Sequence, residues 1–176
     1  MASSPIIDLD TWNVEETKFA VMKGSNAKNC SVTNSVTKQT IEIKTSAFIS
    51  KYGIDDKYVD LKIKINVGEI SFEKFKQFDN FVMNLDKFTF LDKKIKDQEY
   101  SPLICNDSYM NFHIKIDKIV VVGKENEIID FELSIENLKK IVWKKKIICF
   151  IKFEHLYDIC GKYGVKKFVT KIQIVE

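Results

Sequence analysis

The chain has 176 residues, of which 45% are hydrophobic and 30% are charged, and its formal net charge is +3. This length and apolar share fit one globular domain and exclude a disordered tail. No stretch approaches the ~18 consecutive apolar residues of a membrane-spanning helix, and the first residues lack a secretory-signal pattern. We therefore expect a soluble, intracellular protein without a membrane partner.

Lysine supplies all 28 basic residues, because the sequence contains no arginine. An anionic partner would therefore be held by ammonium groups and backbone N–H groups rather than by guanidinium forks. Residues 1–133 contain 18 lysines and 21 acidic residues, whereas residues 134–176 contain 10 lysines and 4 acidic residues. The basic last quarter indicates an acidic polymer as a partner, and the alternative is a solvated lysine-rich surface.

The first part of the chain is interpreted as an N-terminal arm, residues 1–16, followed by a single domain, residues 17–176. Residues 17–22 are expected to form the first strand, and residues 23–37, which contain Gly24, three serines and three asparagines, a loop. Residues 39–45 alternate apolar and polar side chains, which predicts a half-buried strand.

The clearest strand prediction covers residues 58–67. Apolar residues occupy one face there, and polar residues, including Lys62 and Lys64, occupy the other. A helix is expected next, with Ser71 as its N-cap. Its aromatic and aliphatic residues recur at three- and four-residue steps, which predicts a helix that packs against the sheet.

Further strands are expected in the second half of the chain, at residues 110–122 (as one strand or a bent pair), 128–133, 146–153 and 166–175. Ser134 is expected to cap a short helix, and residues 157–164 to connect the last two strands. The total is about seven strands and two helices without β-α-β alternation. This pattern favours a mainly β (α+β) fold, an antiparallel sheet curled into a barrel.

Motifs for catalysis are missing from the sequence, which has no nucleotide-binding glycine loop, nucleophile elbow or zinc-protease motif. Two histidines and no arginine leave little for nucleophilic or phosphoryl-transfer chemistry. The four cysteines form no CxxC pair, so no metal and no cofactor are expected, and the thiols should be reduced. The chain is predicted not to be an enzyme, with a carboxylate site at Asp55 or Asp60 as a remote alternative.

Lysines and aromatic residues alternate in the last quarter of the chain. Single-stranded nucleic acid needs both, because cations neutralise phosphates and aromatic faces stack bases. Alternation along the strand from Lys146 places Phe150 and Lys152 on its outer face, whereas alternation along the last strand places Phe168 in the core. Phe150 and Trp143 are therefore candidate stacking residues, with ordinary packing as the alternative for each.

The candidate nucleic-acid-binding residues lie on outward strand faces or in the basic last quarter. They are Lys62, Lys64, His113, Lys115, Lys139, Lys140, Trp143, Lys144, Lys145, Lys146, Phe150, Lys152, Tyr157, Tyr163, Lys166 and Lys167. No catalytic residue and no metal ligand is predicted.

Several segments resemble the single-stranded DNA-binding proteins of poxviruses and other large DNA viruses. They are VDLKIKIN at 59–66, YSPLICNDSYMNFHIKIDKIVVV at 100–122, ENL at 136–138 and GKYGVKKFVTKIQIV at 161–175. The resemblance implies an OB-like barrel that coats single-stranded DNA during viral replication. It also implies viral replication proteins as partners and the host cytoplasm as the location.

The leading hypothesis is a sequence-tolerant, non-catalytic single-stranded DNA-binding protein. The alternative is a viral β-barrel or sandwich that binds proteins, either as a host-factor antagonist or as part of a virion or replication complex. The low net charge and the acidic residues 1–133 support this alternative. The choice between DNA and RNA stays open, as does a homo-oligomer formed through strand edges or the arm.

Overall fold

One large mixed β-sheet with two α-helices forms the described part of the chain, in a computed structural model. The structure describes residues 5–21, 30–51, 53–55, 61–66, 72–85, 98–105, 109–130, 132 and 134–176. Within these ranges the sheet has thirteen strands. The side chains of residues 21, 55, 61–66 and 158 are outside the description.

The strands are β1 (Ile6–Asp8), β2 (Thr17–Val21), β3 (Cys30–Asn34), β4 (Glu42–Lys44), β5 (Phe48–Ile49), β6 (Ile54–Asp55), β7 (Leu61–Asn66), β8 (Glu99–Ser101), β9 (Ile104–Cys105), β10 (Tyr109–Ile114), β11 (Val120–Val122), β12 (Lys146–Ile159) and β13 (Lys162–Ile174). The helices are α1 (Glu73–Asn84) and α2 (Ile135–Val142), and short 3-10 turns cover Leu9–Thr11 and Val14–Glu16.

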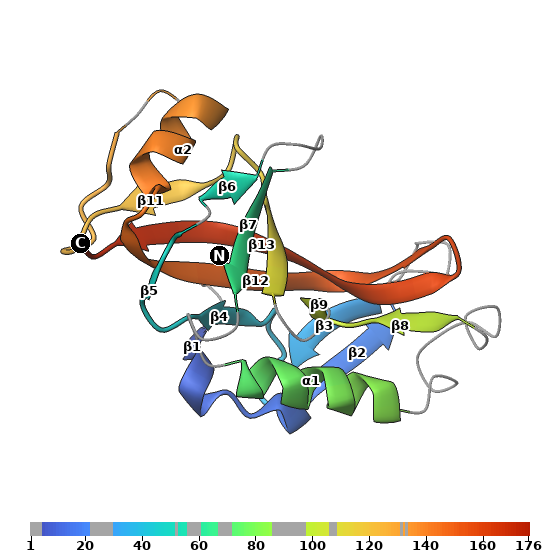
Figure 1. The fold of residues 1–176 in the computed structure, drawn as a ribbon. Coiled ribbons are helices and arrows are strands. Elements are labelled where there is room, and N and C mark those ends of the chain that lie inside the picture. The colour runs from blue at the N-terminus through green and yellow to red at the C-terminus, as the bar shows by residue number, and fades with distance from the viewer. Residues whose placement is uncertain are drawn as a thin grey trace.

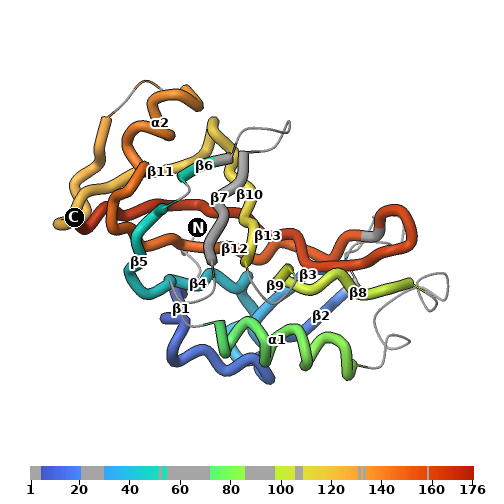
Figure 2. Tube along the Cα trace, viewed as in Figure 1, coloured from blue at the N-terminus to red at the C-terminus, as the bar shows by residue number. Residues whose placement is uncertain are grey.

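Two long strands, β12 and β13, form the centre of the sheet. Their tight turn consists of Cys160 and Gly161, whose φ angles of 52° and 77° are typical of a two-residue hairpin turn. The sheet continues from β12 to β4 and β1, and from β13 to β10, β7 and β6. Figure 1 shows α1 and β1–β3 at one end of the molecule and α2, β6 and β11 at the other. Figure 2 shows the β12–β13 hairpin extending across the molecule, between these two ends.

The mainly β class with two helices is confirmed, but the antiparallel barrel of about seven strands is not. The pairs β1–β4, β8–β13, β10–β13 and β11–β13 are parallel. In the described residues the path from β1 to β6 stays open, so no barrel closes. Parallel neighbours need long crossover connections, and the segments between β1 and β4 and between β10 and β13 supply them.

Three expected boundaries also differ from the structure. Strand β3 lies inside the expected loop 23–37, where it pairs with β2 and β12. Most of the expected connection 157–164 belongs to β12 and β13. Of the expected strand 128–133, the described residues form only a bridge between Ile128 and Val122. Only the first depends on a partner that is distant in sequence, because Ser31 of β3 pairs with His155 of β12, whereas the other two involve pairing between nearby residues.

Helix α1 packs its aromatic stripe into the core, as its periodicity predicts. Phe75 and Phe78 are fully buried. The ring of Trp12 lies 5.2 Å from that of Phe78 and 5.6 Å from that of Phe153, so the N-terminal segment, α1 and β12 share one aromatic cluster.

The two expected helix caps have different outcomes. Ser134 caps α2 as predicted, because its side chain accepts a hydrogen bond from the Asn137 N–H at 3.2 Å. Ser71 lies outside the described residues, and Phe72 precedes α1 without a side-chain cap bond.

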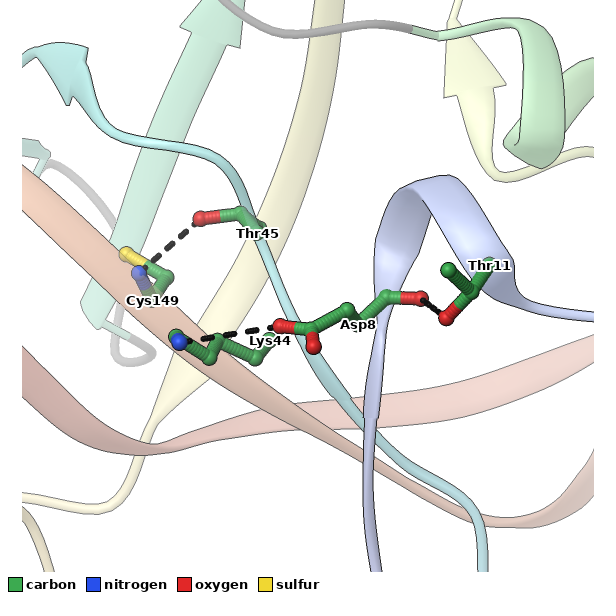
Figure 3. Close-up of polar contacts among 5 residues, drawn as sticks. All are labelled: Asp8, Thr11, Lys44, Thr45 and Cys149. Atoms are coloured by element: carbon green, nitrogen blue, oxygen red, sulfur yellow. Dashed lines mark hydrogen bonds and ion pairs between the residues drawn. The ribbon is translucent and has the colours of Figure 1, made fainter.

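The N-terminal segment is tied to the sheet by polar contacts (Figure 3). The Lys44 ammonium lies 3.6 Å from the Asp8 carboxylate, and the Thr11 hydroxyl donates to the Asp8 carbonyl. The Thr45 hydroxyl accepts a hydrogen bond of 3.0 Å from the Cys149 N–H. The Lys44–Asp8 pair joins β1 to β4, and the Thr45–Cys149 hydrogen bond joins the residue after β4 to β12.

Asp79 of α1 accepts hydrogen bonds from the segment that contains β8 and β9. It is 5% exposed, and its carboxylate accepts hydrogen bonds from the Tyr100 hydroxyl (2.8 Å) and from the N–H groups of Leu103 (2.8 Å) and Ile104 (3.3 Å). Burial raises the pKa of Asp79, while these hydrogen bonds and the charge of Lys167 act in the opposite direction. The carboxylate is therefore a structural acceptor inside the fold.

Candidate nucleic-acid interface

The outer face of the β12–β13 hairpin includes Lys152 and Phe168, which lie opposite each other in register. The next pair along, Ile151 and Val169, belongs to the hydrophobic core. Because successive strand residues point to opposite faces, Lys152 and Phe168 are turned away from that core. On its other side, Phe168 lies opposite His113 of β10.

A β-bulge follows at Thr170, which has no partner in β12. An extra residue reverses the face of every residue after it. The outer face therefore holds Phe168 before the bulge and Lys171 after it, while Lys167 lies on the core side, opposite Phe153. Strict alternation predicts Phe168 in the core and Lys167 outside. Phe168 is indeed buried, at 8% exposure, but on the outer face rather than in the core cluster.

Phe168 lies in a surface cavity of about 210 Å³, here named the Phe168 hollow. The lining residues are Lys115, Lys118, Lys152, Glu154, Phe168, Val169 and Thr170. Lys115 and Lys118 belong to the segment after β10, whereas Lys152 and Glu154 belong to β12. Strand β13 thus forms the floor, and lysines from two separate segments form the walls.

Cationic side chains cover the ring of Phe168. The Lys115 ammonium lies 3.8 Å from the ring centroid, and the Lys166 ammonium lies 5.4 Å from it. The His113 ring is 6.1 Å away at 60°. Each cation–π contact at such a partly exposed site contributes roughly 0.5–1 kcal/mol. Two lysine ammonium groups thus lie over the Phe168 ring.

The charge in the Phe168 hollow is positive overall. The Lys115 ammonium is 3.3 Å from the Glu154 carboxylate, which also lies 3.6 Å from the His155 ring nitrogen. Within the part of the chain that the structure describes, Lys118 and Lys152 have no carboxylate at ion-pair distance. Three lysines against one glutamate leave two ammonium groups available to an anion.

His155 directly follows Glu154 in β12. Partial burial lowers the pKa of its imidazole, and the nearby ammonium groups of Lys166 and Lys115 act in the same direction, against the Glu154 carboxylate. The positive field of the hollow is thus supplied by lysine.

The same outer face continues on both sides of the hollow. Phe150 is 5% exposed and lies under the Lys171 ammonium, 4.5 Å from its ring centroid. In the other direction Tyr157 lies opposite Gly164, and its phenol occupies the space that a Cβ at Gly164 would need. Phe150 and Tyr157 are separated by roughly 23 Å along the strand, at ~3.3 Å per residue. Because a second register shift lies between Phe153 and His155, Phe150 and Tyr157 lie on the same face of β12 although they are seven residues apart.

Trp143 borders a second cavity, of about 240 Å³, here named the Trp143 hollow. It is lined by Lys51, Gly53, Ile54, Lys139 and Trp143. The indole is 60% exposed, and the Lys144 ammonium lies 5.8 Å from its ring centroid. Two predicted residues, Lys139 and Trp143, meet here.

Other predicted residues lie outside both hollows. The Lys140 ammonium is 2.8 Å from Glu136 on α2, and the Lys146 ammonium is 3.4 Å from Glu176. Exposed Lys145 lines neither hollow.

Tyr163 is 1% exposed, so its ring cannot stack a base in this fold. Its ring packs against Tyr100 at 5.3 Å on the core side of the hairpin. The interpretation of Tyr163 as a stacking residue is therefore corrected.

Lys62 and Lys64 lie in β7, opposite His113 and Asn111 of β10. Their side chains are outside what the structure describes. Their register positions place them next to β10 in the sheet.

The structure adds Phe168, Lys118, Lys171 and Glu154 to the candidate interface. Local alternation does not mark Phe168, whose outward position depends on the bulge at Thr170, or Lys118, which a distant segment brings beside β13. Among the described residues, no group of three or more His, Cys, Asp or Glu side chains is placed to hold a metal ion. The helices of these ranges are also too short or too polar to span a bilayer.

Comparisons with known proteins give little further information. No protein-family model and no curated protein matches the sequence. Among solved structures, the chain is similar to a "Single-stranded DNA-binding protein from bacteriophage Enc34, C-terminal truncation", with a TM-score of 0.46 and 10% identity. The match covers 90% of this chain and 94% of that chain. It gives no support to the poxvirus family, and similarity at this level assigns no function.

Proposed function

We propose that the chain is a non-catalytic protein that binds single-stranded DNA without reading its sequence. The observation that carries the proposal is the ring of Phe168 on the floor of a hollow whose walls carry Lys115, Lys118 and Lys152. Ammonium groups neutralise phosphates, and a ring face stacks any of the bases. The proposed setting, viral DNA replication, rests on the resemblance of the sequence segments alone.

Binding at this site requires Lys115 to leave the ring. The move costs roughly 0.5–1 kcal/mol for the cation–π contact and at most about 1 kcal/mol for the partly exposed ion pair with Glu154. A stacked base contributes roughly 1–3 kcal/mol, and the released ammonium gains a phosphate. At the midpoints of these ranges the stacking gain exceeds the cost, and Lys115 serves as a cover for Phe168 that the nucleic acid displaces.

The direct test is a titration of fluorescein-labelled poly-dT, followed by anisotropy over a salt series. Four phosphate contacts, from Lys115, Lys118, Lys152 and Lys166, give an expected slope of log K against log salt of roughly −3, at ~0.7 per single-strand contact. Duplex DNA of the same length should bind more weakly. Equal, weak binding to both forms, or no binding at low salt, contradicts the proposal.

Replacing Phe168 with leucine should weaken binding of poly-dT roughly 5- to 150-fold without changing the salt slope. The substitution removes a stacking face worth ~1–3 kcal/mol and leaves every lysine in place. The same titration measures it, with Phe81→Leu on α1 as the matched control. A changed slope with unchanged affinity would show that the ring only supports the lysines.

Replacing Glu154 with glutamine should strengthen binding roughly 1.5- to 5-fold at low salt. The change frees Lys115 from an ion pair and removes the one negative charge in the hollow, an effect of ~0.2–1 kcal/mol. The gain should fade as salt rises, because exposed charges are screened. Glu99→Gln, which breaks the 3.9 Å pair with Lys162, is the control. An equal gain in affinity in both variants would show that the effect depends on net charge and not on the Phe168 hollow.

Among the described residues β1 is an edge strand of the sheet, which favours protein binding as a second candidate. Ile6 of β1 is 52% exposed, and Val36 is 70% exposed beside a cavity of about 300 Å³ that Ile7 and Trp12 also line. An unpaired edge strand accepts a strand from another chain. Self-association in sedimentation together with no binding of poly-dT at low salt would favour this function.

A further inference from the structure

We infer that the bound single strand leaves the Phe168 hollow along the β12–β13 hairpin toward its tip, where Tyr157 forms a second stacking subsite. The inference rests on the proposed function and deepens it, because it gives the strand a path and a second ring. Three features carry it: the register of the hairpin, the position of Tyr157 over Gly164, and the turn that bounds the other end of the outer face.

The two rings lie on the same face of the hairpin. Each of residues 162–169 of β13 has a partner in β12, so alternation along this stretch of β13 is unbroken. Phe168, Lys166 and Gly164 therefore share the outer face, and the Lys166 ammonium is indeed 5.4 Å from the Phe168 ring centroid. Tyr157 is the partner of Gly164, so its side chain belongs to the outer face as well.

The phenol of Tyr157 lies flat across the glycine opposite it. The position of a Cβ at Gly164 would be 2.7 Å from the Tyr157 hydroxyl oxygen, 2.8 Å from its Cζ and 3.0 Å from its Cε1. Such similar distances to three neighbouring atoms mean that Gly164 lies against the face of the ring and not against its edge. The side chain is half-buried, with one ring face on the sheet and the other directed outward. The outward face can stack a base.

A turn bounds the end of the outer face that lies away from the hairpin tip. The Lys171 side chain donates a hydrogen bond of 3.3 Å to the Asn126 side-chain oxygen, and the Gln173 amide donates one of 3.0 Å to the Lys124 carbonyl. The turn after β11 is thus tied to this end of β13. Figure 1 shows α2 and β11 at one side of the molecule and the hairpin tip at the other. A strand that follows β13 from the Phe168 hollow therefore runs toward the tip.

Lysines accompany the path between the two rings and beyond it. Lys166 lies between Phe168 and Gly164 on the outer face, and Lys162 follows next to the tip, with its ammonium 3.9 Å from the Glu99 carboxylate. Gly164 lies four positions before Phe168, which is roughly 13 Å at ~3.3 Å per residue. Bases repeat every ~3.4 Å in a stacked strand, so about four nucleotide steps join the two rings. A dinucleotide therefore reaches one ring only, whereas dT8 spans both.

The test measures the affinity for dT8 by anisotropy of a fluorescein label at low salt. Tyr157→Leu should weaken binding of dT8 roughly 5- to 150-fold, the range expected for the loss of one stacked base, and Tyr157→Phe should retain most of the affinity. Tyr157→Leu should change the affinity for dT2 little, because a dinucleotide still has the Phe168 hollow. Competition of unlabelled dT2 against labelled dT16 measures that affinity.

A second variant disturbs the same subsite without removing a ring. In Gly164→Ala the added Cβ meets the phenol and forces it from its position, while every lysine and every aromatic residue is kept. Binding of dT8 should weaken. Because this loss acts through Tyr157, the double variant of Gly164→Ala and Tyr157→Leu should bind dT8 as Tyr157→Leu alone does. Phe81→Leu on α1 is the matched control and should bind as wild type does.

The outcomes separate the two proposals. Failure of wild type to bind labelled dT16 at low salt overturns the proposed function, and with it the second subsite. If wild type binds dT16 but Tyr157→Leu binds dT8 as tightly as wild type, the second subsite is overturned and the proposed function stands. The same conclusion follows if Phe81→Leu loses as much affinity, or if Gly164→Ala has its full effect in the Tyr157→Leu background. Circular dichroism spectra equal to that of wild type show that the variants are folded.

Discussion

Replacing Lys118, Lys152 and Lys166 together with glutamine is expected to weaken binding of poly-dT roughly 100-fold at 0.1 M salt. Each single-strand phosphate contact contributes ~0.7 to the slope of log K against log salt, so three contacts contribute about 2. The slope should therefore fall from roughly −3 to roughly −1. These lysines surround Phe168, and none has a carboxylate at ion-pair distance among the described residues. The anisotropy titration over salt measures both quantities.

The matched control is the triple variant of Lys18, Lys74 and Lys76 to glutamine. It changes the net charge by the same amount, but these residues lie on β2 and α1 and line neither hollow. Its slope should stay near that of wild type. An equal loss in the two triple variants would mean that binding depends on the overall charge and not on the Phe168 hollow.

Replacing Asp79 with alanine is expected to lower the free energy of unfolding by at least about 3 kcal/mol. The change leaves three donors, the Tyr100 hydroxyl and the N–H groups of Leu103 and Ile104, without their acceptor, at roughly 1–3 kcal/mol each. The melting temperature should fall by roughly 6–12 °C, at ~2–4 °C per kcal/mol for a chain of this size. Thermal unfolding followed by circular dichroism measures the shift. Exposed Asp10→Ala is the control, and an equally small shift in both variants contradicts the structural role.

The pH dependence of Asp79 has a defined sign. Burial raises its pKa in the folded protein above the ordinary value of 3.8, so the folded state binds this proton more tightly than the unfolded state. Its contribution to stability is greatest when the carboxyl is protonated, and it is lost as pH rises from 3.8 through the raised pKa. In urea denaturation, the stability of Asp79→Asn relative to wild type should therefore increase over that interval. A difference that is constant with pH would contradict the raised pKa.

Local patterns in the sequence determined the α1 core stripe, the Ser134 cap and the outer position of Phe150 and Lys152. Each depends on neighbours one to four residues away, because helix and strand periodicities repeat over that distance. Composition likewise determined that no guanidinium group is present to hold an anion. These properties needed no knowledge of which strands pair.

Tertiary structure alone decided that Phe168 faces outward and that Lys118 lies beside it. A bulge depends on how many residues the partner strand places opposite, so Thr170 carries no signal of its own. The parallel crossover from β10 to β13 brings together residues some 50 positions apart, such as Lys118 and Phe168. Alternation along a strand predicts which face of the sheet a residue occupies only while the strand register is continuous. The Phe168 hollow lies at a break in the register between β12 and β13.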